Sequence, residues 1–135
     1  MPTSDSTTHA INARESLRHL AHTTRHLTDP GEVYELLGDL SGAITSLAQS
    51  LHQIGKVHDN LEVGQAHVAG GARTGRATSY AVSWELHRAA QILTQAAAGI
   101  DRAHENEARI SYTSPDPLLT PRQSSGAPTN NGLRR

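Results

Sequence analysis

Three histidines with potential for metal binding lie in the segment RHLAHTTRHL, residues 18–27. His22 and His26 are one helical turn apart, and His19 precedes them by three residues. Imidazole pairs at this spacing can bind a divalent ion, but zinc sites in proteins use three or four protein ligands with supporting partners. We therefore expect a solvated polar face here, with a metal-responsive or pH-responsive surface as the alternative reading.

Arginines make the same segment the most basic part of the chain. Arg14, Arg18 and Arg25 alternate with the histidines, whereas acidic residues gather from position 32 to position 39. Surface charges of opposite sign contribute about 0–1 kcal/mol per exposed pair. We expect the two groups to complement each other within the fold or across a dimer, and binding of an acidic partner is the alternative.

An aromatic stripe is the most unusual feature of the second half of the sequence. In SYAVSWELHRAA, Tyr80, Trp84 and His87 follow each other at spacings of four and three, which places them on one face of a helix. Tryptophan is enriched at the energetic centres of protein interfaces. These three residues are the predicted partner-binding patch, although Trp84 could instead cover the bundle within one chain.

Two glycines form a small-residue groove in the preceding helical segment. Gly38 and Gly42 are four residues apart, and each glycine inside a helix costs about 1 kcal/mol relative to alanine. This cost suggests a packing reason. We expect a bulky side chain to lie over the groove, from Trp84 of a second copy or from the N-terminal helix.

Helical periodicity defines three elements, over about 10–28, 30–60 and 79–110. Asp29 is a predicted N-cap, and Pro30 occupies the first helical position. Apolar or small residues recur at alternating spacings of three and four in all three segments, a heptad pattern typical of coiled coils and bundles. The predicted packing seams are Ala10, Ala13, Leu17, Leu20, Thr24 and Leu27; Val33, Leu37, Leu40, Ile44, Leu47, Leu51 and Ile54; and Val82, Leu86, Ala89, Leu93, Ala96, Ile100 and Ala103.

This pattern predicts an all-α fold. The segments 30–60 and 79–110 should form an antiparallel long-helix hairpin, and the N-terminal helix should complete a three-helix bundle. A loop with four glycines, 61–79, joins the two long helices. We expect disorder in 1–9 and in the Pro/Ser/Asn-rich tail 113–135, with residues 10–112 as the helical domain. So slender a hairpin buries little, which favours dimerisation.

Composition excludes several classes of function. The chain has 135 residues, no cysteine and a net charge of -1, so thiolate sites are excluded and nothing favours nucleic acid or a membrane surface as a partner. No catalytic motif places a nucleophile beside a base, and no cofactor motif is present. Without a Sec-type signal, the expected location is the cytoplasm.

Two resemblances to known proteins are visible. The sequence Tyr112-Thr113-Ser114-Pro115-Asp116 resembles the YxxxD motif that follows the second helix in the WXG100 class of type VII secretion substrates. The Trp-X-Gly turn of that class is absent, the loop is longer and the N-terminal helix is additional. The chain is Arg-rich and Lys-poor, and with its segment WELHRAA it is similar to small uncharacterised helical proteins of actinobacteria.

The sequence therefore predicts a non-enzymatic helical module for protein–protein interaction or self-association, with itself or another helical protein as partner. The WXG100 resemblance implies an alternative, an exported helical hairpin in which Tyr112 and Asp116 form the secretion motif. Metal binding by the N-terminal histidines is a second alternative.

Overall fold

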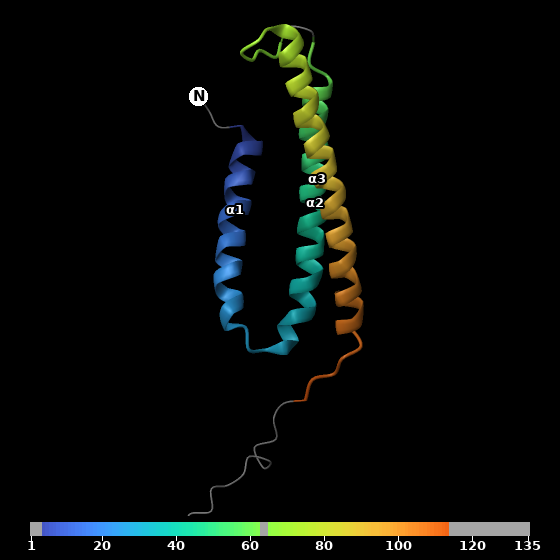
Figure 1. Cartoon of the computed structure of the whole chain (residues 1–135). Helices are drawn as coiled ribbons and strands as arrows, with labels where there is room; N and C mark the ends of the chain where they lie inside the picture. The colour runs from blue at the N-terminus through green and yellow to red at the C-terminus, as the bar shows by residue number, and fades with distance from the viewer. Residues whose placement is uncertain (1–3, 63–64, 114–135) are drawn as a thin grey trace, which may run out of the picture.

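The computed structural model describes residues 4–62 and 65–113, and these form three helices (Figure 1). Their bounds are Asp5–Thr23 for α1, Val33–Asp59 for α2 and Ala72–Glu107 for α3. Short 3-10 turns, Thr24–His26 and Pro30–Glu32, lie between α1 and α2. No strand occurs in the described part of the chain, which confirms the all-α fold class.

Capping interactions mark the start of α1 and of the turn that leads into α2. The Ser4 side chain accepts a hydrogen bond from the Thr7 amide, so α1 starts at Asp5, and residues 5–9, expected to be disordered, are helical. Asp29 accepts a hydrogen bond of 2.8 Å from the Gly31 amide and so caps the 3-10 turn Pro30–Glu32, whereas α2 itself begins at Val33 without a side-chain cap. The predicted tail lies outside the described residues from position 114 onward.

The start of α3 differs from the prediction by seven residues. Gly70 and Gly71 have positive φ angles and end the loop, but Gly75 lies inside the helix. A Cβ atom at Gly75 would lie 2.1 Å from the Ala66 carbonyl oxygen, so the loop backbone passes directly against α3 at this point. The glycine-rich composition indicated a loop throughout, whereas this glycine is required by close approach of two backbones.

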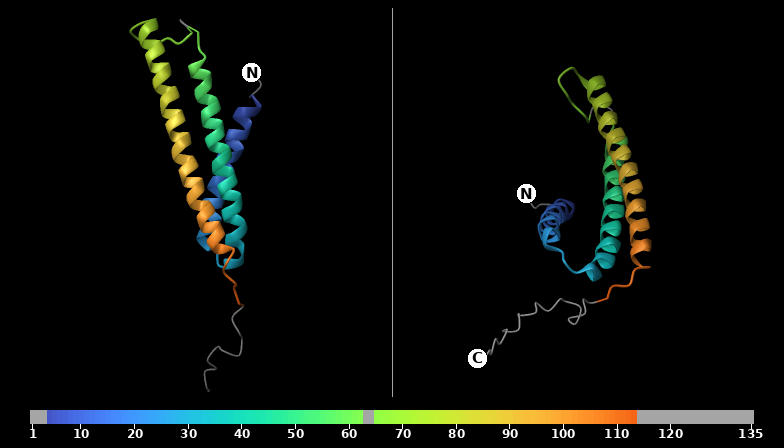
Figure 2. Two further views of the ribbon diagram at one scale, coloured as in Figure 1. Left: turned by 90° about the vertical axis from the view of Figure 1, so that its right-hand side faces the viewer. Right: turned by 60° about the horizontal axis from the view of Figure 1, so that its bottom comes forward.

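The two long helices form the predicted antiparallel hairpin (Figures 1 and 2). Residue pairs that meet across it run in opposite directions: Ser41 bonds with Asp101, His52 with His87 and Asp59 with Ser83. The helix α1 lies beside the hairpin, and within the described ranges it makes no contact with α2 or α3. None of its residues is buried.

Small and polar residues, not the predicted seams, line the contact between α2 and α3. We call this set the inner register. It repeats at spacings of three and four along both helices. Its members include Tyr34, Gly38, Ser41, Thr45, Ala48, His52, Gly55 and Asp59 on α2, and Ser79, Ser83, His87, Ala90, Thr94, Ala97, Asp101 and His104 on α3.

The predicted seams were wrong by one residue, or about 100° of helix rotation. Each inner-register residue directly follows a predicted seam position, with Asp59 and Ser79 as the exceptions. Small side chains let two helices approach more closely than leucines allow. The interior of the hairpin therefore contains little apolar side-chain volume. Among the described residues, the buried apolar side chains are three alanines, Ala48, Ala90 and Ala97. No helix in the described part of the chain is long and apolar enough to cross a membrane.

Candidate functional site

A hydrogen-bonded network occupies the inner register near the loop end of the hairpin. His52 Nδ1 and His87 Nδ1 lie 2.7 Å apart, and His87 Nε2 lies 3.0 Å from Asp59 Oδ2. The other Asp59 oxygen accepts a hydrogen bond from the Ser83 hydroxyl. If His87 donates from Nε2 to the carboxylate, its Nδ1 accepts from His52, so one proton arrangement satisfies every group with neutral rings.

The hydrogen bonds of this network change the acidity of the carboxyl group. The Ser83 hydroxyl and, next in importance, the His87 ring hold the pKa of Asp59 below its ordinary value, because both stabilise the ionised form. The nitrogen and oxygen atoms that could bind a metal form a chain from His52 through His87 to Asp59, and both ring nitrogens of His87 are used within it. These atoms therefore do not converge on one position where an ion could bind. Among the described residues, no group of three or more metal-ligating side chains could hold an ion.

Glycines of α2 make room for the histidines of α3. A Cβ atom at Gly55 would lie 2.9 Å from His87 Nε2, and one at Gly38 would lie 3.3 Å from His104 Nε2. The His104 ring also stacks on Tyr34, with 4.1 Å between ring centroids. These contacts fix the register of the two helices at both ends of the hairpin.

The predicted groove of Gly38 and Gly42 is not a single surface. Gly38 packs against His104 of the same chain, whereas a Cβ atom at Gly42 would meet nothing within 4 Å. The two glycines therefore have different environments, and the expected bulky side chain over Gly38 is an intramolecular histidine. Gly55, which the sequence did not single out, has the closer contact.

The predicted aromatic patch is also divided. Trp84 and Tyr80 are 59% and 45% exposed, and each ring lies beside an arginine one turn away, Arg88 and Arg76 respectively. His87 instead points into the hairpin, where it bonds with α2. The structure thus leaves Tyr80 and Trp84 on the surface and removes His87 from the patch.

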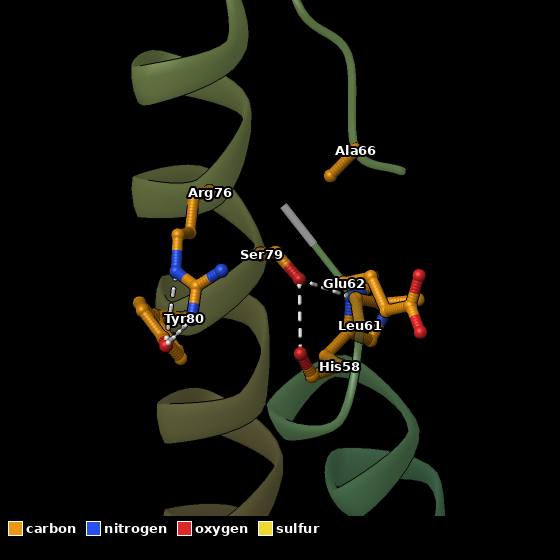
Figure 3. A pocket seen from close by; sticks show the side chains of 7 residues that line it. All are labelled: His58, Leu61, Glu62, Ala66, Arg76, Ser79 and Tyr80. Atoms are coloured by element: carbon orange, nitrogen blue, oxygen red, sulfur yellow. Dashed lines mark hydrogen bonds between the residues drawn. The ribbon is translucent and has the colours of Figure 1, made fainter. Parts of the chain in front are cut away.

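A small cavity lies where the loop meets α3 (Figure 3). Its volume is about 10 Å³, which suits at most one water molecule. His58 Nδ1 lies 2.9 Å from the Ser79 hydroxyl at its wall, and the Arg76 guanidinium donates to the Tyr80 hydroxyl. A larger open hollow of about 330 Å³ lies at the other end of the hairpin, beside Tyr34 and Tyr112.

The site residues predicted on the N-terminal helix lie on the surface of α1 or, for Arg25 and His26, in the 3-10 turn that follows it. Glu15 pairs with Arg18 at 2.9 Å and with Arg14 at 3.7 Å, so part of the basic face is neutralised within its own helix. His19, His22, Arg25 and His26 are exposed. The His22 and His26 rings meet edge to face, with 6.1 Å between centroids.

The predicted secretion motif is described only in part. Tyr112 is 47% exposed and donates a hydrogen bond to Glu107, an interaction that raises the pKa of the phenol. Asp116 lies outside the described residues.

The large apolar residues of the predicted seams of α2 and α3 lie outside the hairpin interior in two stripes, and these stripes form the largest candidate site. Each stripe residue directly precedes an inner-register residue, so it points about 100° away from the partner helix. In two right-handed helices packed antiparallel, this rotation turns both stripes to the same side of the hairpin. We call this side the apolar face; it comprises Leu37, Leu40, Ile44, Leu47, Leu51 and Ile54 of α2 and Val82, Leu86, Leu93 and Ile100 of α3.

No residue of the apolar face is buried. Leu47 is 45% exposed and Ile54 is 50% exposed, midway along α2 and toward its loop end. Large contiguous apolar surfaces on a protein mark sites of interaction. The sequence contains the signal for this arrangement, a second three-and-four pattern of small and polar residues beside the leucines, but the leucine pattern is the one that predicts a packing seam.

Comparison with known proteins gives no relative: the chain matches no family model, no curated protein and no solved structure.

Proposed function

We propose that this protein is a non-enzymatic helical interaction module that binds another helical surface through the apolar face. The observation that carries the proposal is the reversed distribution of side chains, with small and polar residues inside the hairpin and large apolar residues outside. Among the described residues, no large side chain is fully buried.

The energetics of the hairpin support a partner. Hydrophobic stabilisation is about 25 cal/mol per Å² of apolar surface removed from water, and alanines offer little such surface. The hydrogen bonds of the inner register add only about 0.5–1.5 kcal/mol each, because water competes for the same groups. Covering the leucines and isoleucines of the apolar face would supply the missing burial.

Two exposed polar residues of α2 offer a matched control for a test. Ser46 and Gln53 directly precede Leu47 and Ile54, so they are turned about 100° away from the apolar face, and both are exposed. Aspartate at either pair of positions adds the same charge to the same part of α2. Only the pair at Leu47 and Ile54 places charge on the apolar face.

The test compares L47D/I54D with S46D/Q53D, each expressed as the full chain in the native cells and isolated with its associated proteins. We expect the wild type and S46D/Q53D to be isolated in a complex, with itself or with another protein, and L47D/I54D to be isolated alone while retaining its helical circular dichroism. Retention of every complex by L47D/I54D would contradict the proposal.

A further inference from the structure

We infer that the occupant of the apolar face is a second copy of this chain, so that two hairpins pack face to face as a four-helix bundle. This inference rests on the proposed function and names the partner. Charge distribution, area and the composition of α1 support it.

The charge pattern of the hairpin suits contact between identical surfaces. Between Leu40 and Gly55, α2 contains no Asp, Glu, Lys or Arg, and α3 contains none between Ala89 and Ile100. These two stretches lie opposite each other, because Ser41 meets Asp101 and His52 meets His87. A two-fold dimer brings identical residues together at its centre, where like charges would repel. The central band of the apolar face has no such charges.

The side of the hairpin that carries the apolar face has the area that a stable dimer needs. With 27 residues, α2 is about 40 Å long at 1.5 Å per residue. Two helices with axes about 8–10 Å apart present a surface about 20 Å wide. The product is about 800 Å², which equals the area that each partner buries in a standard protein interface.

The helix α1 is the competing occupant within the chain. In Figure 1 it runs beside the hairpin, but it makes no contact with the described residues of either long helix. The large apolar side chains of α1 are Ile11, Leu17 and Leu20, and Leu27 of its predicted seam follows in the connection to α2. So few side chains cannot cover ten large apolar residues, whereas the same face of a second hairpin can.

The experiment is light-scattering mass determination of the purified full chain over a range of concentrations, with a thermal melt at each. We expect a mass of about twice the chain mass of 14.4 kDa and a melting temperature that rises with concentration, because dimerisation stabilises only the folded state. L47D/I54D should be a helical monomer, S46D/Q53D should remain dimeric, and L17D on α1 should also remain dimeric.

The possible failures are distinguishable. A wild type that is monomeric at every concentration, with a melting temperature independent of concentration, overturns the second copy as occupant. If L47D/I54D then still loses a complex formed in cells, the proposed function stands with a different partner. A dimer that L47D/I54D leaves intact overturns the apolar face as the dimer interface. If L47D/I54D does not fold, the dissociation of the dimer is compared between the milder variant L47A/I54A and its control S46A/Q53A. A weaker dimer in L47A/I54A supports the inference, and equal dimers overturn it.

Discussion

Substitution of Gly55 by alanine tests whether the inner register packs as described. A Cβ atom at this position would lie 2.9 Å from His87 Nε2, and the ring cannot move without stretching its hydrogen bonds to Asp59 and His52. At Gly42 a Cβ atom would meet nothing within 4 Å. The two glycines lie in the same helix, so G42A is a matched control for G55A.

The two substitutions should have effects of opposite sign. Replacing a helical glycine by alanine stabilises a helix by about 1 kcal/mol, and G42A should show this gain in full. Overpacking costs about 1–3 kcal/mol, and a lost hydrogen bond adds about 1 kcal/mol. We therefore expect G55A to lower the free energy of unfolding by about 1–3 kcal/mol, a difference of about 2–4 kcal/mol between the variants.

Urea denaturation followed by circular dichroism measures this difference, with both variants and the wild type at one protomer concentration because association would shift the midpoint. For a domain of this size, 1 kcal/mol corresponds to a change of about 4–8 °C in melting temperature. If G55A is as stable as G42A, then α3 does not approach α2 at His87, and the inner register is incorrect.

Three further predictions concern the network, the loop and the aromatic residues. Because the pKa of Asp59 is lowered in the folded protein, its contribution to stability is complete above the ordinary carboxyl pKa of about 4 and is lost as the pH falls through the folded value. The urea midpoints of D59N and the wild type should therefore differ at pH 6 and converge toward pH 2. A difference between them that does not change with pH would contradict this prediction. G75A should destabilise the protein by at least about 2 kcal/mol, since its Cβ atom would lie 2.1 Å from the Ala66 oxygen, whereas G99A, whose Cβ atom has only an ordinary contact, should not; equal melting temperatures would refute the loop contact. Trp84, the single tryptophan, is 59% exposed, so its fluorescence should be that of a solvated indole and W84A should keep the wild-type mass; a monomeric W84A would move the interface to the aromatic side.

Local sequence determined the secondary structure well. The Asp29–Pro30 start signal, the heptad periodicity of α2 and α3 and the glycine-rich connection all act within a few residues, so they indicate helices and a hairpin without knowledge of the partner helix. The ends of the helices were predicted less accurately. The helix α3 begins before Gly75, and this glycine packs against the loop backbone at Ala66, a contact that local sequence signals do not show.

The rotation of the two long helices about their axes was decided only by tertiary structure. Each helix carries two patterns at spacings of three and four, one residue apart, and either could face the partner helix. The pattern that faces inward contains Gly38 and Gly55 opposite the histidines of α3, and Asp59 and Asp101 opposite serines. Such pairings depend on which residues meet across the hairpin, and periodicity within one helix cannot show this. The same rotation turns the leucines outward, which is why the candidate interaction surface could not be located from sequence alone.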